Sequence, residues 1–316
     1  MRAVGGYFEL ELRKGAEYHP GAIRVNTARN AFEYLLRAGK YRKVYLPAYT
    51  CDVMREPIRK LGLACQYYHL DERLEPLFDV ALVRPREAFV YTNYFGLHGR
   101  GAQRIARVCP NVIIDNAQAF YATPLPGVDA FYSPRKFFGV PDGGYLYTEK
   151  RLAAAPRPAS SWHRMRHLLK RIDGNPDQGY RDFVRNERSL AGQPIAAMSA
   201  LTLALLRNID YEAVRTIRRG NFAFLHSRLG GTNELRVHLG ARDCPLIYPY
   251  LRGDGKVIRK ALIRNKVYVA QYWGPSSLAA RPSPFERHLA DDLLALPIDQ
   301  RYGKADLQEL STLIGG

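Results

Sequence analysis

Lys136 stands in a turn where a lysine amine could become reactive. It follows strand-like residues 128–132 and precedes a run of Gly and Pro residues that leads into strand-like residues 144–147. Partial burial and the neighbouring cation Arg135 would both disfavour the ammonium form of this lysine. A partly neutral lysine amine is a nucleophile and can form a Schiff base with a carbonyl group. On this segment alone, an ordinary surface lysine on a hairpin is an open alternative.

A carboxylate, Asp115, ends a segment of β-branched residues, 111–115, that is typical of a buried strand. Ligands of open α/β sheets bind beyond the carboxyl ends of the strands, so Asp115 is a candidate for ligand binding. Gln118 follows three residues later. The alternative interpretation is that Asp115 caps a turn.

A helix is predicted to begin at Asn26, Thr27 and Ala28. Thr27 is a favourable N-cap, and apolar residues recur on one face of the segment as far as Leu36. A helix N-terminus has free N–H groups and a partial positive charge, so it can bind a phosphate. Most helix N-termini bind nothing, so this feature carries meaning only together with others.

These three features together match what pyridoxal phosphate requires. Its aldehyde needs a lysine amine, its ring nitrogen needs a carboxylate, and its phosphate needs N–H donors. The sequence supplies Lys136, Asp115 and the helix start at Thr27.

The surrounding sequence predicts the elements that would position these residues. Strand-like and helical segments alternate up to about residue 150, a pattern that favours a parallel α/β sheet. Asp52 is predicted to cap a second helix. Strand-like segments return at Pro245–Leu251 and Val267–Trp273, and the chain is predicted to end on a helix at 304–314. We predict a large cofactor-binding domain, residues 1–230, and a small C-terminal domain, residues 231–316.

Other functional classes find little support. The four cysteines form no Cys-x-x-Cys pair, and His163 and His167 have no Glu between them, so a metal site is not expected. No apolar run is long enough to span a bilayer. The first fifteen residues alternate as a strand does and lack the apolar core of a signal peptide, so a soluble cytoplasmic protein is expected.

The formal charge of +17 has three possible explanations. The basic residues are scattered along the chain and accompany no nucleic-acid-binding motif, which disfavours nucleic acid. A small anionic ligand in a positive cleft and a general bias towards arginine both fit better.

The ordered motifs resemble those of the DegT/StrS-type sugar aminotransferases, a branch of the fold type I pyridoxal-phosphate enzymes. Five segments, in order along most of the chain, carry the resemblance: Asn26-Thr27-Ala28, Leu46-Pro-Ala-Tyr-Thr50, Val112-Ile-Ile-Asp-Asn-Ala-Gln118, Ser133-Pro-Arg-Lys136 with Asp142-Gly-Gly144, and Leu296-Pro-Ile-Asp-Gln-Arg-Tyr302. The resemblance implies a large, mixed but mostly parallel sheet flanked by helices, with a smaller C-terminal α+β domain.

The resemblance also implies roles for particular residues. Lys136 would carry the cofactor as a Schiff base, Asp115 would pair with its ring nitrogen, and Gln118 would lie near its 3-hydroxyl group. Asn26, Thr27, Ala28 and Ser133 would lie at its phosphate, Cys51 would face its ring, and Asn186 would reach the phosphate in a neighbouring subunit.

Two positions depart from the family pattern. Cys51 stands where relatives have an aromatic residue against the ring. Phe131 stands five residues before the lysine, where relatives often have a phosphate-binding serine, and Ser133 is only three residues before it. Lys136 itself disfavours the dehydratase branch, in which histidine replaces the lysine.

The expected function is therefore transfer of an amino group from an amino acid, glutamate by resemblance, to a keto sugar linked to a nucleotide. The resemblance implies a homodimer with small-molecule substrates. Two alternatives stay open: a pyridoxal-phosphate lyase or racemase, and a non-catalytic basic binding protein on the same fold.

Overall fold

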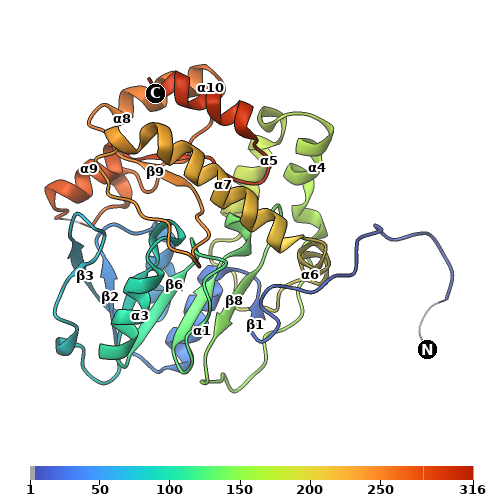
Figure 1. Ribbon diagram of the computed structural model, residues 1–316. Helices are drawn as coiled ribbons and strands as arrows, with labels where there is room; N and C mark the ends of the chain where they lie inside the picture. Colours follow the sequence, from blue (N-terminus) through green and yellow to red (C-terminus); the bar gives the residue numbers. More distant parts are fainter. Residues whose placement is uncertain (1–3, 280, 316) are drawn as a thin grey trace.

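The computed structural model describes residues 4–279 and 281–315, and its centre is an eight-stranded mixed sheet (Figure 1). The spatial order of its strands is β1-β8-β7-β6-β5-β2-β3-β4. Their bounds are β1 (Ile23–Val25), β2 (Lys43–Pro47), β3 (Ala64–Leu70), β4 (Pro76–Leu77), β5 (Glu87–Thr92), β6 (Val112–Asn116), β7 (Asp129–Tyr132) and β8 (Gly144–Tyr147).

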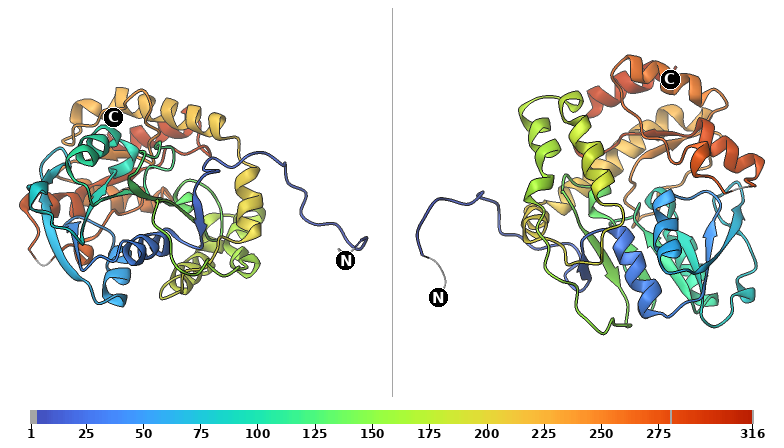
Figure 2. Two further views of the ribbon diagram at one scale, coloured as in Figure 1. Left: turned by 90° about the horizontal axis from the view of Figure 1, so that it is seen from below. Right: turned by 180° about the vertical axis from the view of Figure 1, so that it is seen from behind.

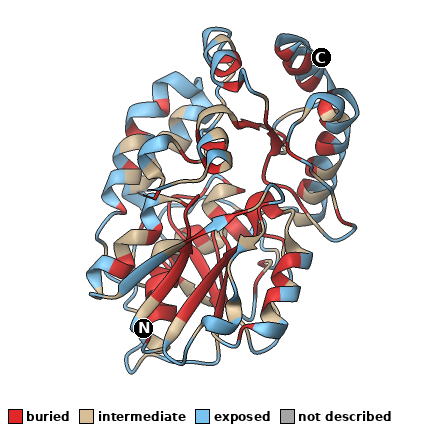
Figure 3. Ribbon diagram, turned by 90° about the vertical axis from the view of Figure 1, so that its left-hand side faces the viewer, coloured by how far each residue is buried: buried red, intermediate tan, exposed pale blue. Residues whose placement is uncertain are grey.

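The middle of this sheet is parallel. The neighbouring pairs from β3 through β2, β5 and β6 to β7 are all parallel, whereas β8, β1 and β4 join antiparallel. All five residues of β6 are buried, as expected for a strand covered on both faces. Figure 3 shows the central strands buried along most of their length, while the surrounding helices keep exposed outer faces.

Alternate residues of each strand enter two different cores, because successive side chains point to opposite faces. One core contains Tyr45, Phe89 and Ile114 together with residues of α3 (Gly99–Val108). The other contains Val44, Val90 and Ile113, with α1 (Ala28–Ala38) and α2 (Arg55–Lys60) packed against them. The remaining helices are α4 (Arg166–Asp173), α5 (Pro176–Ser189), α6 (Ala200–Arg207), α7 (Tyr211–Leu229), α8 (Gly255–Arg264), α9 (Pro284–Asp292) and α10 (Lys304–Ile314).

A third core lies in the C-terminal part of the chain. The antiparallel pair β9 (Tyr248–Tyr250) and β10 (Leu294–Leu296) is packed with α7, α8 and α10 (Figure 2). α7 therefore contributes to this core although it precedes residue 230. The division of the chain into domains at residue 230 stays a prediction. In the described part of the chain, none of the helices is long and apolar enough to cross a membrane.

Several local predictions can be compared with the structure. The N-cap at Thr27 is confirmed, since its hydroxyl accepts from the Asn30 N–H at 3.0 Å, and the terminal helix has the expected bounds, 304–314. The cap at Asp52 is wrong: Asp52 opens the short 3-10 helix η1 (Asp52–Met54), and α2 follows from Arg55.

Two predicted strands are also wrong. Described residues 4–15 form no strand, and residues 267–273 have only an isolated bridge at Ala270. Both segments have strand-like composition, but residues 4–15 pair with no strand of the described chain, and residues 267–273 meet β10 only at the single bridge between Ala270 and Ala295.

The start of β8 depends on glycine. A Cβ atom on Gly144 would lie 2.6 Å from the backbone nitrogen of Ala28, so we expect Gly144→Ala to force apart β8 and α1 and to lower the free energy of unfolding by about 1–3 kcal/mol. Gly220→Ala is the matched control, because a Cβ atom at that position in α7 would meet open space. Its higher helix propensity should raise the free energy of unfolding by about 0.5–1 kcal/mol. Urea denaturation of both variants measures the difference, and equal effects would contradict the close approach.

Candidate active site

Lys136 and Asp115 lie at the same end of the sheet. β6 and β7 are parallel neighbours in which Asp115 is opposite Phe131, so the turn after β7 begins beside the end of β6. Lys136 ends the short 3-10 helix η4 (Pro134–Lys136) that forms this turn. The predicted nucleophile and the predicted carboxylate therefore lie on neighbouring segments at one end of the sheet, near enough for the charge of Lys136 to act on Asp115.

Asp115 is almost completely buried, with 6% of its surface exposed. Burial raises the pKa of its carboxyl group to about 6, while the N–H of Ala117 and the positive charge of Lys136 act in the opposite direction. The Ala117 N–H donates to Oδ1 at 2.8 Å. Asp115 is thus a desolvated carboxylate whose charge is stabilised by one backbone donor and one nearby lysine.

Gln118 holds the loop that follows β5, and one N–H donor of its side chain has no partner in the described part of the chain. Its Oε1 accepts from the Phe95 N–H at 2.7 Å, and Phe95 has a left-handed backbone with φ of 56°. Among the described residues, nothing accepts from the buried Nε2 of Gln118. The buried hydroxyl groups of Tyr49 and Thr92 likewise have no partner there. A buried polar group without a partner costs about 1–3 kcal/mol, so these groups are suited to a bound ligand.

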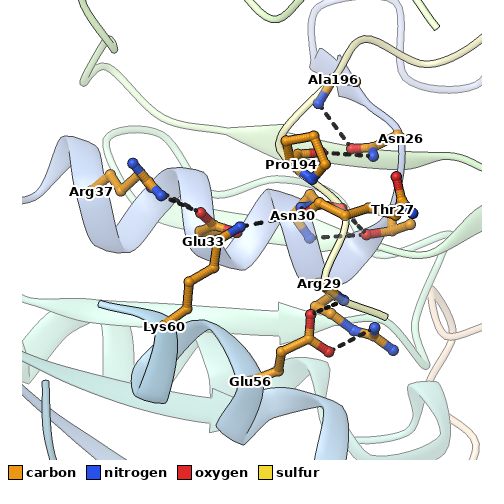
Figure 4. A network of polar contacts seen from close by, with 12 residues as sticks. Asn26, Thr27, Arg29, Asn30, Glu33, Arg37, Glu56, Lys60, Pro194 and Ala196 are labelled. Carbon is orange, nitrogen blue, oxygen red and sulfur yellow. Dashed lines mark hydrogen bonds and ion pairs between the residues drawn. The ribbon is translucent and has the colours of Figure 1, made fainter. Parts of the chain in front are cut away.

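The first turn of α1 is held by a chain segment from far along the sequence (Figure 4). The Asn26 side chain donates to the Pro194 carbonyl at 3.0 Å and accepts from the Ala196 N–H at 3.1 Å. The Thr27 hydroxyl donates to Asn30 Oδ1 at 2.6 Å. These two side chains are therefore engaged by the fold.

Backbone donors remain at this helix end. The Asn30 N–H is capped by Thr27 and the Ala31 N–H donates to the Thr27 carbonyl. The Ala28 N–H faces Gly143 in an isolated parallel bridge, whereas the Arg29 N–H has no acceptor within the helix. A helix N-terminus of this kind can bind an anion through its backbone and its dipole.

Two glycines bring this helix end against the segment that follows Lys136. The Gly143 N–H donates to the Asn26 carbonyl at 2.6 Å, and Gly144 lies against the backbone of Thr27 and Ala28. The predicted phosphate site and the lysine turn are thus joined by backbone contact.

The other predicted site residues have clear positions. Cys51 is half-buried just before η1. Ser133 is buried at the N-cap position of η4, although its side chain makes no capping bond there. Asn186 lies in α5, where its amide donates to the Pro141 carbonyl at 3.2 Å and accepts from Arg164 at 3.2 Å. Its role towards a neighbouring subunit stays a prediction.

Arg135 has a partner of its own. Its guanidinium is paired with Glu187 of α5, and burial lowers its pKa to about 10. The cation that the sequence places beside Lys136 is therefore balanced by a carboxylate.

Two aromatic residues near Lys136 were missed by the sequence analysis. The Lys136 Nζ lies 5.4 Å from the ring centre of Tyr272 and 5.8 Å from that of Trp273. Trp273 also contacts Tyr49, with ring centres 5.1 Å apart. Because residues 267–273 were interpreted as a strand, no pattern in them indicated a contact with the site.

Two cavities lie elsewhere on the described part of the molecule. One, of about 500 Å³, is lined by residues of 71–75, 95–104 and 235–238. The other, of about 1080 Å³, lies between α4–α5 and residues 263–270 and 297–310. Neither is lined by Lys136 or Asp115, and Tyr272 and Trp273 lie against the lysine instead.

Comparisons with known proteins identify the fold. No protein-family profile matches the sequence, and no curated protein is similar to it. Among solved structures, DesI in the presence of its TDP-sugar product is 19% identical, with a TM-score of 0.65 over 93% of this chain and 79% of that one. A DegT DnrJ EryC1 StrS aminotransferase from Brucella abortus is 14% identical, with a TM-score of 0.63 over 93% and 85% of the chains.

A third solved structure is the PLP form of a putative sugar aminotransferase from Streptococcus pneumoniae. It is 12% identical, with a TM-score of 0.64 over 93% of this chain and 86% of that one. The predicted fold class, a fold type I aminotransferase-like α/β fold, is confirmed by these similarities.

The buried carboxylate gives a testable dependence on pH. A carboxyl group whose pKa is higher in the folded protein than in the unfolded chain makes folding less favourable as pH rises between the two values. The pKa of Asp115 is about 6 in the folded protein, against an ordinary 3.8. As pH rises from 4.5 to 8, the free energy of unfolding of the ligand-free Asp115→Asn variant should therefore increase by about 2 kcal/mol relative to that of the parent.

Urea denaturation of the parent and the variant at both pH values measures this change. Asp254→Asn is the control, because Asp254 is exposed and Arg252 lowers the pKa of its carboxyl group. The free energy of unfolding of this variant, relative to that of the parent, should therefore change with pH in the opposite direction. A pH-independent difference for Asp115→Asn would contradict the raised pKa.

Proposed function

We propose that this protein is a pyridoxal-phosphate-dependent aminotransferase that moves an amino group from an amino acid to a keto sugar. The observation that carries the proposal is that Lys136 and the buried carboxylate of Asp115 lie on neighbouring segments at one end of a parallel sheet. The same fold in a sugar aminotransferase solved in its PLP form, and in a protein solved with a TDP-sugar product, supports it.

The residues at this place fit the cofactor. Asp115 is a desolvated acceptor suited to a protonated ring nitrogen, and the spare Nε2 donor of Gln118 is suited to a ring oxygen. The N-terminal end of α1, where the Arg29 N–H has no acceptor within the helix, is suited to the phosphate. Thr27 and Asn26 would support this phosphate site indirectly, since their side chains hold the first turn of α1 in place.

When bound, pyridoxal phosphate supplies an electron sink for the bonds of the substrate's α-carbon. Lys136 would hold the cofactor and then act through its Nζ as a base and an acid. It would take a proton from the donor's α-carbon in the first half of the reaction and give a proton to the carbon that receives the amino group in the second half. Asp115 would keep its negative charge close to the ring nitrogen. Tyr272 and Trp273 would exclude water from Lys136, because their rings lie against its side chain.

The substrates can be specified further as part of the proposal. Glutamate is the proposed amino donor, and a nucleotide-linked keto sugar is the proposed acceptor. The formal charge of +17 supports an anionic acceptor such as a sugar diphosphate. We further propose a cytoplasmic homodimer in which Asn186 lies close to the partner's cofactor phosphate.

Replacing the lysine tests the proposal directly. We expect purified Lys136→Ala to lose the visible absorbance of bound cofactor and at least about 10³-fold of amino-transfer rate, because both the attachment and the proton transfer use its Nζ. Absorbance spectra and a coupled transfer assay measure these two effects. Lys256→Ala is the control, since Lys256 is exposed at the start of α8 and should leave both unchanged. Wild-type turnover by Lys136→Ala would refute the assignment.

A half-reaction separates amino transfer from lyase or racemase chemistry. Glutamate added without an acceptor should convert the bound cofactor to its aminated form, with loss of the visible band and release of one oxo-acid per site. A cofactor-loaded protein that fails this conversion with all common amino donors would be a different kind of pyridoxal-phosphate enzyme. A protein that takes up no cofactor would be a binding protein on this fold.

A further inference from the structure

The N-terminal segment of residues 4–12, here called the arm, has no contacts that explain its apolar side chains. Val4, Tyr7 and Phe8 are the most exposed large hydrophobic side chains in the described part of the chain, at 98%, 99% and 92%, and Leu10 is 64% exposed. Large apolar side chains left this exposed together indicate a binding surface. Figures 1 and 2 show the arm extending away from the body of the protein.

The base of the arm is fixed. The Arg13 N–H donates to Asn208 Oδ1 at 2.9 Å, and the Gly15 N–H donates to the Arg207 carbonyl at 3.1 Å. The chain is therefore attached at the end of α6, and the arm begins from a defined point. Nine extended residues reach about 30 Å from there.

The arm has the pattern of a strand without being one. Phe8, Leu10 and Leu12 alternate with Tyr7, Glu9 and Glu11, so an extended arm would have one apolar face and one face with two carboxylates. Its described residues form no ladder within the chain. An extended segment with this pattern can bind a second surface that covers its apolar face.

A groove with complementary chemistry lies on the same molecule. The cavity of about 1080 Å³ beside α4 and α5 has an aromatic wall formed by Tyr180, Phe183 and Tyr268. These three rings are exposed, so they too lack a covering partner. Arg171 and Lys266 lie exposed at its rim, and Arg301 lines it as well. Its carboxylates are Asp306 and Glu309 on the α10 side and Asp177, which accepts from the Tyr268 hydroxyl at 2.8 Å.

We propose that the arm of one copy docks in this groove of a second copy of the chain. The apolar face would pack on the aromatic wall, and Glu9 and Glu11 would face Arg171 and Lys266. A second copy is the partner that presents both complementary surfaces at equal concentration, and a two-fold arrangement would form the contact twice. This contact does not depend on the proposed catalytic function.

Cross-linking between isotopically distinct chains tests the contact. Phe8 is replaced by the photoreactive p-benzoylphenylalanine in full-length protein, and light and heavy-isotope chains are mixed before irradiation. We expect mass spectrometry to find light–heavy cross-links to Tyr180, Phe183 or Tyr268. Cross-links only within one chain, cross-links to another surface, or none at all would overturn the proposal.

Variants give a second and independent measurement. Phe8→Ser with Leu10→Ser should raise the dimer Kd at least tenfold in sedimentation equilibrium, whereas Leu82→Ser, matched to Leu10 in exposure at 62%, should not. Arg171→Glu with Lys266→Glu should weaken the dimer, and adding Glu9→Lys with Glu11→Lys should restore it. An unchanged Kd in the Phe8 and Leu10 variant, or a parent protein that is monomeric at all concentrations, would refute the arm contact.

Discussion

The close approach of Gly143 and Gly144 to the first turn of α1 is the constraint on which the candidate site depends. It places the strand that follows the lysine turn in backbone contact with Thr27 and Ala28, at a distance that no side chain at position 144 would permit. The helix end is fixed from its other side by Pro194 and Ala196. Three segments that are far apart in the sequence, 26–28, 143–144 and 194–196, thus meet at one helix N-terminus.

The second requirement is electrostatic. A carboxylate buried as deeply as Asp115 is unfavourable for the ligand-free fold, and the raised pKa of its carboxyl group expresses that cost. The positive charge of Lys136, in the turn after the adjacent strand β7, offsets part of that cost, and a protonated ring nitrogen would offset more. The buried Nε2 donor of Gln118 carries a similar cost, since it has no hydrogen-bond partner among the described residues and a ligand could supply one. Such sites reduce the stability of the free protein and favour binding.

Local patterns were sufficient to predict the parts of the site that lie within one element. Thr27 caps α1 because a hydroxyl residue precedes a run with helical periodicity, and Asp115 lies one residue before the end of β6 because the three residues before it are suited to burial. The sequence could also order these features along the chain. It gave no indication of the Gln118–Phe95 bond, or that Asn186 and Glu187 of α5 would lie against the lysine turn. Those contacts depend on packing between distant segments, which spacing in the sequence does not encode.

The position of Tyr272 and Trp273 shows how the C-terminal part of the chain reaches the site. Residues 270–279 form no strand, yet they are held against the end of β2: Ala279 donates to the Ala48 carbonyl, and Ser277 bonds to Asp52 and Arg55. These polar contacts hold the aromatic pair over Lys136 without a sheet ladder. The buried ring of Trp273 adds apolar packing against Tyr49 and Tyr94. The C-terminal segment therefore covers Lys136 in the turn after β7, while Asp115 lies beside it in β6.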